Sequence, residues 1–177
     1  MNKKLKLWEL NRVSEEEFKA QQKFPLIVIL DDIRSLNNIG SFFRTADAFN
    51  VEKIYLCGIT ATPPHREIQK IALGATDSID WEYRNSITEL IAELKENDVK
   101  VVTIEQTEQT TLLQNIHTLD GNKFALVFGN EVNGVNQTIV NASDYVVEIP
   151  QFGTKHSLNV SVCAGVVLWE FAKRFIP

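Results

Sequence analysis

Three segments of the chain place glycines and polar side chains directly after short apolar runs. They are residues 37–46, residues 128–135 and residues 149–162, and they contain the arginine, glutamate, asparagines and serines that could do chemistry. In α/β proteins, ligand sites lie on loops at the carboxyl ends of strands, where a rigid sheet holds them. The sequence therefore predicts one composite site built from three strand-end loops.

Several common sites are excluded by the residues that stand at the critical positions. Gly129 and Gly134 have the spacing that opens a phosphate-binding loop, but Val135 and Asn136 follow where Lys and Ser or Thr are required. No G-x-G-x-x-G follows an apolar run, so a Rossmann dinucleotide site is unsupported. From the residues alone, 129–134 could equally be a plain turn, and Glu131 could simply begin a helix, where the helix dipole favours an acid.

A hydrolase and a metal site are also disfavoured. His156 precedes Ser157, but a histidine adjacent in sequence rarely points at its neighbour, and no G-x-S-x-G is present. The three histidines and the two cysteines, Cys57 and Cys163, lack the spacing of metal ligands, so we expect no metal. Both cysteines lie in apolar runs, as reduced, buried thiols do.

The three polar segments resemble, in order and spacing, the motifs of the SpoU/TrmH family of SPOUT-superfamily RNA ribose 2′-O-methyltransferases. They read Asn-Asn-Ile-Gly-Ser-Phe-Phe-Arg-Thr-Ala, Phe-Gly-Asn-Glu-Val-Asn-Gly-Val and Ile-Pro-Gln-Phe-Gly-Thr-Lys-His-Ser-Leu-Asn-Val-Ser-Val. The resemblance runs from about Leu26 to Phe171. It implies a mostly parallel sheet with helices on both faces, a C-terminal trefoil knot and a homodimer formed around that knot.

The resemblance also implies the cofactor and the residues that bind it. S-adenosylmethionine would lie in a slot formed by main-chain groups of Gly129, Ile149 and Leu158, under a roof of residues 151–157. The predicted cofactor-binding residues are Gly129, Asn130, Ile149, Gln151, Ser157 and Leu158. Ser157 and Asn159 would order the roof near the donor methyl group.

The predicted catalytic residues are Arg44, Asn38, Glu131, Ser157 and Asn159. Arg44 stands among apolar residues, where an unpaired charge is costly, which suggests that it meets an anion. A guanidinium lacks a free lone pair and has a pKa above about 12, so it is a poor base. Arg44 would instead clamp a phosphate and stabilise the developing alkoxide, while phosphate or water takes the proton. Asn38 would hold the substrate or the dimer-facing loop.

The resemblance implies 2′-O-methylation of a ribose, with guanosine favoured as the nucleoside and tRNA favoured over rRNA. The alternative is a non-catalytic RNA-binding or assembly protein that kept the fold, and binding of S-adenosylhomocysteine separates the two. The chain has a net charge of −5, of which residues 77–108 carry nine acids against three bases. An acidic back and a more basic site face would suit an RNA partner, although an ordinary solvated surface explains the charge equally well. Arg34, Arg66 and Lys155 are the expected RNA contacts.

Apolar runs alternate with amphipathic stretches, which predicts α/β architecture. Strands are expected at residues 26–30, 53–57, 100–104, 124–128 and 145–149. Helices are expected after Ser14 and Ser86, where capping boxes stand, and at residues 41–49, 67–73 and 158–175. Residues 158–169 hold no charge, so this last helix should lie in the core or against a second subunit.

A chain of 177 residues, 44% of them hydrophobic, suffices for one domain. We expect residues 1–24 to form a short helical extension and residues 25–177 the methyltransferase domain. No apolar stretch approaches the length of about 20 residues that a membrane helix needs. No apolar signal region follows Lys3 and Lys4, so a cytoplasmic location is expected.

Overall fold

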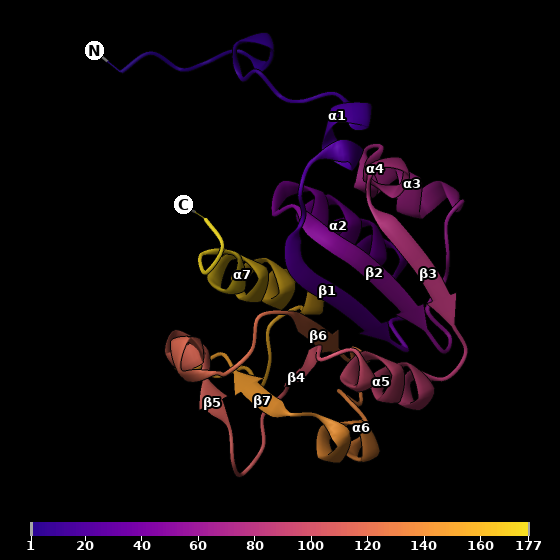
Figure 1. The fold of residues 1–177 in the computed structure, drawn as a ribbon, viewed down its shortest axis with the longest axis vertical. Helices are drawn as coiled ribbons and strands as arrows, with labels where there is room; N and C mark the ends of the chain where they lie inside the picture. Colours follow the sequence, from indigo (N-terminus) through magenta and orange to yellow (C-terminus); the bar gives the residue numbers. More distant parts are fainter. Residues whose placement is uncertain (1, 177) are drawn as a thin grey trace.

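A parallel seven-stranded sheet organises the chain in the computed structural model, which describes residues 2–176. The strand order is β3-β2-β1-β6-β4-β7-β5 (Figure 1). Every pair of neighbouring strands runs parallel. The strands are β1 (Phe24–Asp31), β2 (Val51–Cys57), β3 (Asp80–Arg84), β4 (Lys100–Ile104), β5 (Thr111–Leu112), β6 (Phe124–Phe128) and β7 (Tyr145–Glu148). The predicted α/β class is confirmed.

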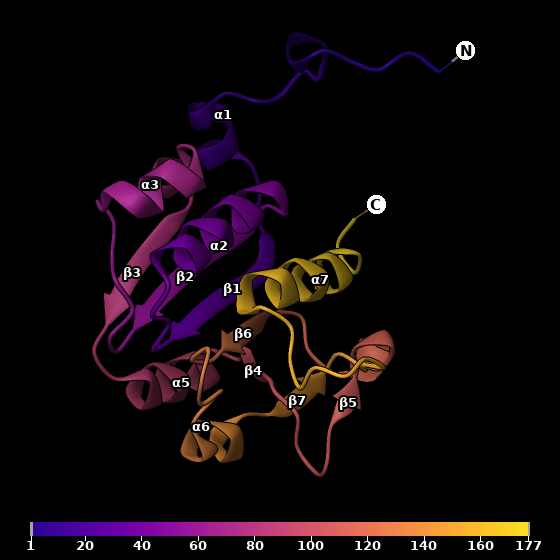
Figure 2. The same cartoon turned by 180° about the vertical axis from the view of Figure 1, so that it is seen from behind.

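Helices cover both faces of the sheet, as parallel strands buried on both sides require. The larger core lies under α2 (Leu36–Ala48), α3 (Arg66–Ala72), α4 (Ala75–Ser78) and α7 (Val160–Ala172). The smaller core lies under α5 (Ile87–Glu96) and α6 (Gln137–Ala142) on the opposite face (Figures 1 and 2). A 3₁₀ helix, η2 (Leu113–Thr118), adds Leu113 and Ile116 to the larger core. The knot itself remains a prediction.

Helix α2 begins five residues earlier than predicted, so Asn38 and Gly40 lie inside a helix and not in a loop. Ser35 caps it, because its hydroxyl oxygen accepts a hydrogen bond from the Asn38 amide. Gly40 permits close packing against α3, since a Cβ at that position would lie 2.7 Å from the Ile68 carbonyl oxygen. A polar, glycine-containing start thus concealed a helix that is held by tertiary contacts.

The final helix is shorter than predicted and is only partly buried. It begins at Val160, because the Asn159 side chain accepts hydrogen bonds from the amides of Ser161 and Val162. One face of α7 packs on α2 and η2 and is buried, whereas Val162, Val166 and Trp169 on another face are 42–55% exposed. These three side chains form the α7 apolar surface.

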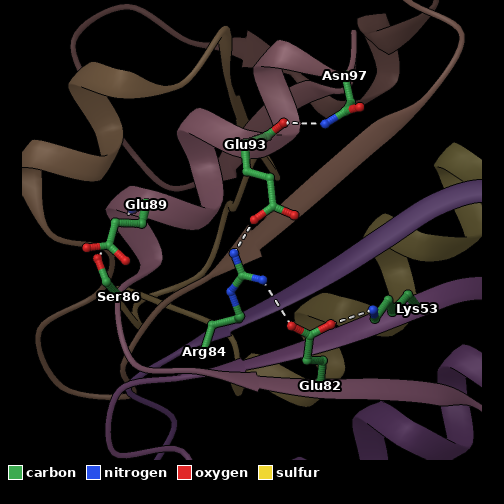
Figure 3. A network of polar contacts seen from close by, with 7 residues as sticks. All are labelled: Lys53, Glu82, Arg84, Ser86, Glu89, Glu93 and Asn97. Carbon is green, nitrogen blue, oxygen red and sulfur yellow. Dashed lines mark hydrogen bonds and ion pairs between the residues drawn. The ribbon is translucent and has the colours of Figure 1, made fainter.

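The acid-rich stretch forms an edge strand that the sequence reading missed. In β3, charged residues alternate with aromatic ones, and Figure 3 shows how those charges pair. The Glu82 carboxylate contacts Lys53 Nζ at 2.7 Å and Arg84 Nη1 at 3.0 Å, and the same guanidinium reaches Glu93 on α5. The predicted acidic back is therefore partly neutralised, and Arg84 is already committed to two carboxylates.

The region before β1 holds η1 (Leu7–Glu9) and α1 (Glu15–Ala20) and extends away from the sheet (Figures 1 and 2). The predicted capping box at Ser14 and Glu17 opens α1, with both reciprocal hydrogen bonds present. The division at residue 24 stays a prediction. None of the helices described in residues 2–176 combines the length and the apolar character that crossing a bilayer demands.

Candidate active site

A cavity of about 580 Å³ opens where β6, β4 and β7 end, three strands that are neighbours in the sheet. Its walls come from residues 104–106 after β4, residues 128–135 after β6, and positions between 147 and 160 after β7. All six residues predicted to bind the cofactor line this cavity. The catalytic candidates Glu131, Ser157 and Asn159 line it too, which brings two of the three sequence segments together.

Gly129 is required by the loop that it begins. A Cβ on Gly129 would lie 2.4 Å from the backbone of both Gly134 and Val135, because the loop folds back on itself there. The backbone amide of Gly134 donates to the Asn130 carbonyl oxygen at 2.9 Å and closes the turn. A side chain at 129 would thus displace the loop backbone before it could obstruct a ligand.

Asn130 braces the same loop from within. Its Nδ2 donates to the Asp32 carbonyl oxygen at 2.8 Å, while its Oδ1 accepts from the amides of Val132 and Asn133. These contacts use both ends of the side-chain amide. Asn130 therefore fixes the loop after β6 to the end of β1, and its side chain has little capacity left for a ligand.

Glu131 joins this loop to the start of α2. Its carboxylate accepts hydrogen bonds from the amides of Arg34 and Ser35 and from Asn38 Nδ2, each at 3.0 Å. Burial alone would raise the pKa of Glu131, but these hydrogen bonds outweigh burial and hold the pKa below its ordinary value. The carboxylate is thus ionised at neutral pH and anchors the positive end of the helix.

Asn159 extends the network to α7. Its Nδ2 donates to Asn38 Oδ1 at 3.2 Å, and its own Oδ1 caps α7. Glu131, Asn38 and Asn159 therefore form a continuous chain of hydrogen bonds between three segments far apart in sequence. This chain brings the first polar segment to the other two, as the composite-site prediction requires.

The roof, residues 151–157, is held at one point and is otherwise exposed. Gln106 Nε2 donates to the His156 carbonyl oxygen at 3.1 Å and ties the roof to the end of β4. Phe152 is 96% exposed. Leu158 precedes the first turn of α7 and lines the cavity beside Ile149, so its main-chain groups stand outside the helix.

Arg44 does not line the cavity. Its side chain is exposed on α2 and makes no hydrogen bond or ion pair with the residues that the structure describes. The apolar surroundings expected for Arg44 are not found in a single chain, because Phe42, Phe43 and Ala46 are buried in the core while Arg44 is exposed. Its contact with an anion stays a prediction. Arg34, Arg66 and Lys155 are exposed as well.

The sequence reading missed the contribution of β4 to the cavity. Glu105 and Gln106 line it, although Glu105 was counted among the acids of a distant back surface. Cys163 lines it as well, and burial together with nearby Glu105 raises the pKa of its thiol to about 12, so the thiol stays protonated. The lining holds three glutamates and no lysine or arginine. Across residues 2–176, no cluster of three His, Cys, Asp or Glu side chains is placed to hold a metal ion.

The parallel sheet places its cavity between strand-end loops, which is where α/β proteins bind small ligands. The model of the SpoU rRNA Methylase family matches residues 25–169, and the chain belongs to this family. The chain is 32% identical to the 23S rRNA (guanosine-2′-O-)-methyltransferase RlmB of Neisseria meningitidis, over 82% of this chain and 57% of the relative. It is 29% identical to YacO of Bacillus subtilis, a putative TrmH family tRNA/rRNA methyltransferase, over 96% of this chain and 65% of the relative.

Solved structures agree with the sequence relatives. The TrmH/SpoU tRNA modifying enzyme of A. aeolicus is similar with a TM-score of 0.78 and 25% identity, over 90% of this chain and 81% of that one. The AdoMet-bound rRNA methyltransferase of Sinorhizobium meliloti is similar with a TM-score of 0.79 and 27% identity, over 90% of this chain and 60% of that one. The predicted family is confirmed, and the chain spans less than two thirds of the length of the two sequence relatives.

Proposed function

We propose that the protein transfers a methyl group from S-adenosylmethionine to the 2′-hydroxyl of a ribose in structured RNA. The observation that carries this proposal is the hydrogen-bonded chain Glu131–Asn38–Asn159 at the rim of a cavity formed by the family's second and third motifs. Relatives that are S-adenosylmethionine-bound or named as RNA methyltransferases support the cofactor and the reaction. The anionic lining suits a sulfonium cofactor, whose reacting sulfur is positively charged.

In the reaction, S-adenosylmethionine would supply the methyl group: the ribose oxygen would bond to the methyl carbon as the bond from that carbon to sulfur breaks, and the hydroxyl proton would pass to a phosphate of the RNA or to water. Glu131 holds the α2 start in place and is too strongly stabilised as an anion to serve as the base. Asn159 and Ser157 order the segment over the methyl group. Arg44 stabilises the developing alkoxide and the neighbouring phosphate of the RNA.

A homodimer completes the site in this proposal. The α7 apolar surface begins at Val162, which stands between Val160 and Cys163, two residues that line the cavity. A partner packed on Val162, Val166 and Trp169 would therefore stand beside the cavity mouth. An arginine exposed outside its own cavity is the arrangement expected when the partner subunit uses it. Such a pairing is closed and two-fold symmetric, as most homo-oligomers are.

The identity of the target RNA is the most specific part of the proposal. The lean towards tRNA finds no support in the sequence relatives, among which 23S rRNA guanosine enzymes recur. We therefore place a guanosine of ribosomal RNA first and tRNA second, with the protein working in the cytoplasm.

Radiolabelled methyl transfer to purified ribosomal RNA and tRNA, followed by nucleoside analysis, tests the proposal. We expect label on a ribose 2′-oxygen of ribosomal RNA. Label confined to tRNA would reverse the order of targets, and label on a base would overturn the reaction. Calorimetric titration with S-adenosylhomocysteine should show binding; its absence, with no methyl transfer, would favour the non-catalytic RNA-binding protein.

A further inference from the structure

We propose that Glu105 binds the two hydroxyl groups of the cofactor ribose and so makes the cavity selective for a ribonucleoside. This inference rests on the proposed cofactor, S-adenosylmethionine. Glu105 directly follows β4, which lies between β6 and β7, the strands that carry the other cavity loops. Its side chain therefore enters the cavity from the middle of the three strand ends.

The Glu105 carboxylate is held rigidly, yet its capacity to accept hydrogen bonds is not exhausted. One oxygen accepts from the Val135 amide at 3.1 Å and the other from the Gln106 amide at 2.8 Å. A carboxylate offers about four acceptor positions, so about two remain for a ligand. The glycine at 134 is part of this arrangement, because a Cβ there would lie 2.2 Å from Glu105 Oε2.

The other two carboxylates of the cavity are held differently. Glu131 receives three hydrogen bonds at the start of α2, so only about one acceptor position remains on it. Glu148 accepts one hydrogen bond, from Thr110 Oγ1 at 3.2 Å on the β5 side, so its carboxylate is fixed at one oxygen only. A fixed carboxylate with one vacant position on each oxygen matches two adjacent hydroxyl donors. The same pairing of an acid with a ribose is used in dinucleotide-binding folds.

The position of Glu105 in the sheet indicates that it contacts the ribose of the cofactor and not the methionine end. The Glu131–Asn38–Asn159 chain marks the side where RNA must meet the methyl group, next to α2 and β1. Glu105 lies two strands from β1, beyond β6. The carboxylate therefore faces the nucleoside part of the ligand while the methionine part extends towards α2.

The proposal is tested by removing each ligand hydroxyl and the Glu105 carboxylate in turn and measuring how the affinity changes. Calorimetry would compare S-adenosylhomocysteine with its 2′-deoxy and 3′-deoxy forms on the wild-type chain and on Glu105→Gln. We expect each deoxy form to bind the wild-type chain about 10- to 100-fold more weakly, since hydrogen bonds to charged groups contribute about 1.5–3 kcal/mol. That penalty should largely vanish in Glu105→Gln. Glu148→Gln is the matched control and should keep the penalty.

A ligand without the amino-acid part separates the ribose from the methionine ammonium. The effect of Glu105→Gln should persist with 5′-methylthioadenosine, which has the diol but no ammonium group. An effect seen only with S-adenosylhomocysteine would assign Glu105 to the ammonium and overturn the proposal. Equal binding of the deoxy forms to the wild-type chain, or an equal loss for every ligand in Glu105→Gln, would overturn it too. Failure of the wild-type chain to bind S-adenosylhomocysteine at all would overturn the proposed function itself.

Discussion

Three hydrogen-bond donors converge on the carboxylate of Glu131, and we therefore propose that the residue positions α2 and does not act as a base. Because its pKa is lowered on folding, Glu131 contributes stability that is present above the ordinary carboxyl pKa, 4.5, and is lost as pH falls through the lower folded value. The start of α2 should therefore loosen in acid before the core does.

Glu131→Gln should remove this acid-dependent part of the stability. We expect the variant to be less stable than the wild-type chain at neutral pH, with a difference that shrinks as pH falls below about 4.5. Urea denaturation across that range measures it. Glu16→Gln, on the exposed side of α1, is the control and should follow the wild-type curve. A difference for Glu131→Gln that is independent of pH would contradict the anchoring role.

In the proposed reaction, the chemistry depends most on Arg44. Arg44→Ala should leave the affinity for S-adenosylhomocysteine nearly unchanged, because the side chain lies outside the cavity of its own chain. Methyl transfer should fall about 10²- to 10³-fold, the usual cost of losing an electrostatic stabiliser. Single-turnover assays at saturating cofactor measure the fall, and Lys19→Ala is the control for a lost surface cation. Wild-type turnover in Arg44→Ala would show that the assignment is wrong.

At the scale of elements, the loop after β6 depends on glycine at 129. Gly129→Ala should destabilise the protein and weaken cofactor binding together, since the new Cβ would meet the backbone of residues 134 and 135. Gly153→Ala in the roof is the matched control, because no atom lies within 4 Å of the added Cβ. Thermal melts measure the stability of both variants, and calorimetry measures their affinity for S-adenosylhomocysteine. A Gly129→Ala variant that kept its stability and lost only cofactor binding would contradict this, and would show that position 129 matters only through its closeness to the ligand.

The sequence predicts those elements whose pattern is local. The central strands β1 and β6 contain continuous apolar runs and β4 is largely apolar, and these runs locate the three strands to within two residues. The edge strand β3 escaped because it alternates charged and aromatic residues, and its charges pair both with each other and with Lys53 and Glu93 on other elements. The start of α2 escaped because Asn38 and Gly40 are stabilised by contacts with Glu131 and α3 that lie far away in sequence.

In the candidate site, too, the residues marked by a local pattern could be predicted and those placed by the sheet order could not. The loops after β6 and β7 are recognisable because glycine and amide residues mark them, and both line the cavity. Glu105 carries no such mark, since it stands in a run rich in acids. Only the strand order, with β4 between β6 and β7, brings it to the cavity. A pattern read along the chain does not contain the order of strands across the sheet.

At the scale of the whole molecule, the α7 apolar surface predicts a homodimer. Light scattering at micromolar concentration should give about twice the mass of one chain, 20.1 kDa. Val166→Glu should yield a folded monomer with little methyl transfer, because Val166 is 42% exposed in the single chain. Val167→Glu, at a fully buried neighbour, should instead fail to fold, since it buries an unpaired charge. A monomeric wild-type protein with full activity would exclude a shared site.

RNA binding should depend on the exposed cations predicted to contact RNA and not on the paired ones. Removing Arg34, Arg66 or Lys155 should reduce the slope of log affinity against log salt by about 0.7–0.9 each, one phosphate contact per residue. Lys95→Gln should leave the slope unchanged, because Lys95 pairs with Asp144 at 3.2 Å. Filter binding at several salt concentrations measures both. Equal slopes for all four variants would place the RNA elsewhere on the surface.

The position of α7 has a consequence for how the chain is made. Residues 160–172 emerge from the ribosome after all seven strands, yet Ala164, Val167, Leu168 and Phe171 are fully buried against elements that come earlier in the chain, among them α2, η2 and β6. A nascent chain stopped before residue 160 therefore exposes the apolar faces of α2 and η2. Such an intermediate is prone to aggregate and is a natural client for chaperones. We expect ribosome-bound chains of up to 159 residues to remain protease-sensitive, and protection to appear only when the last helix has left the exit tunnel.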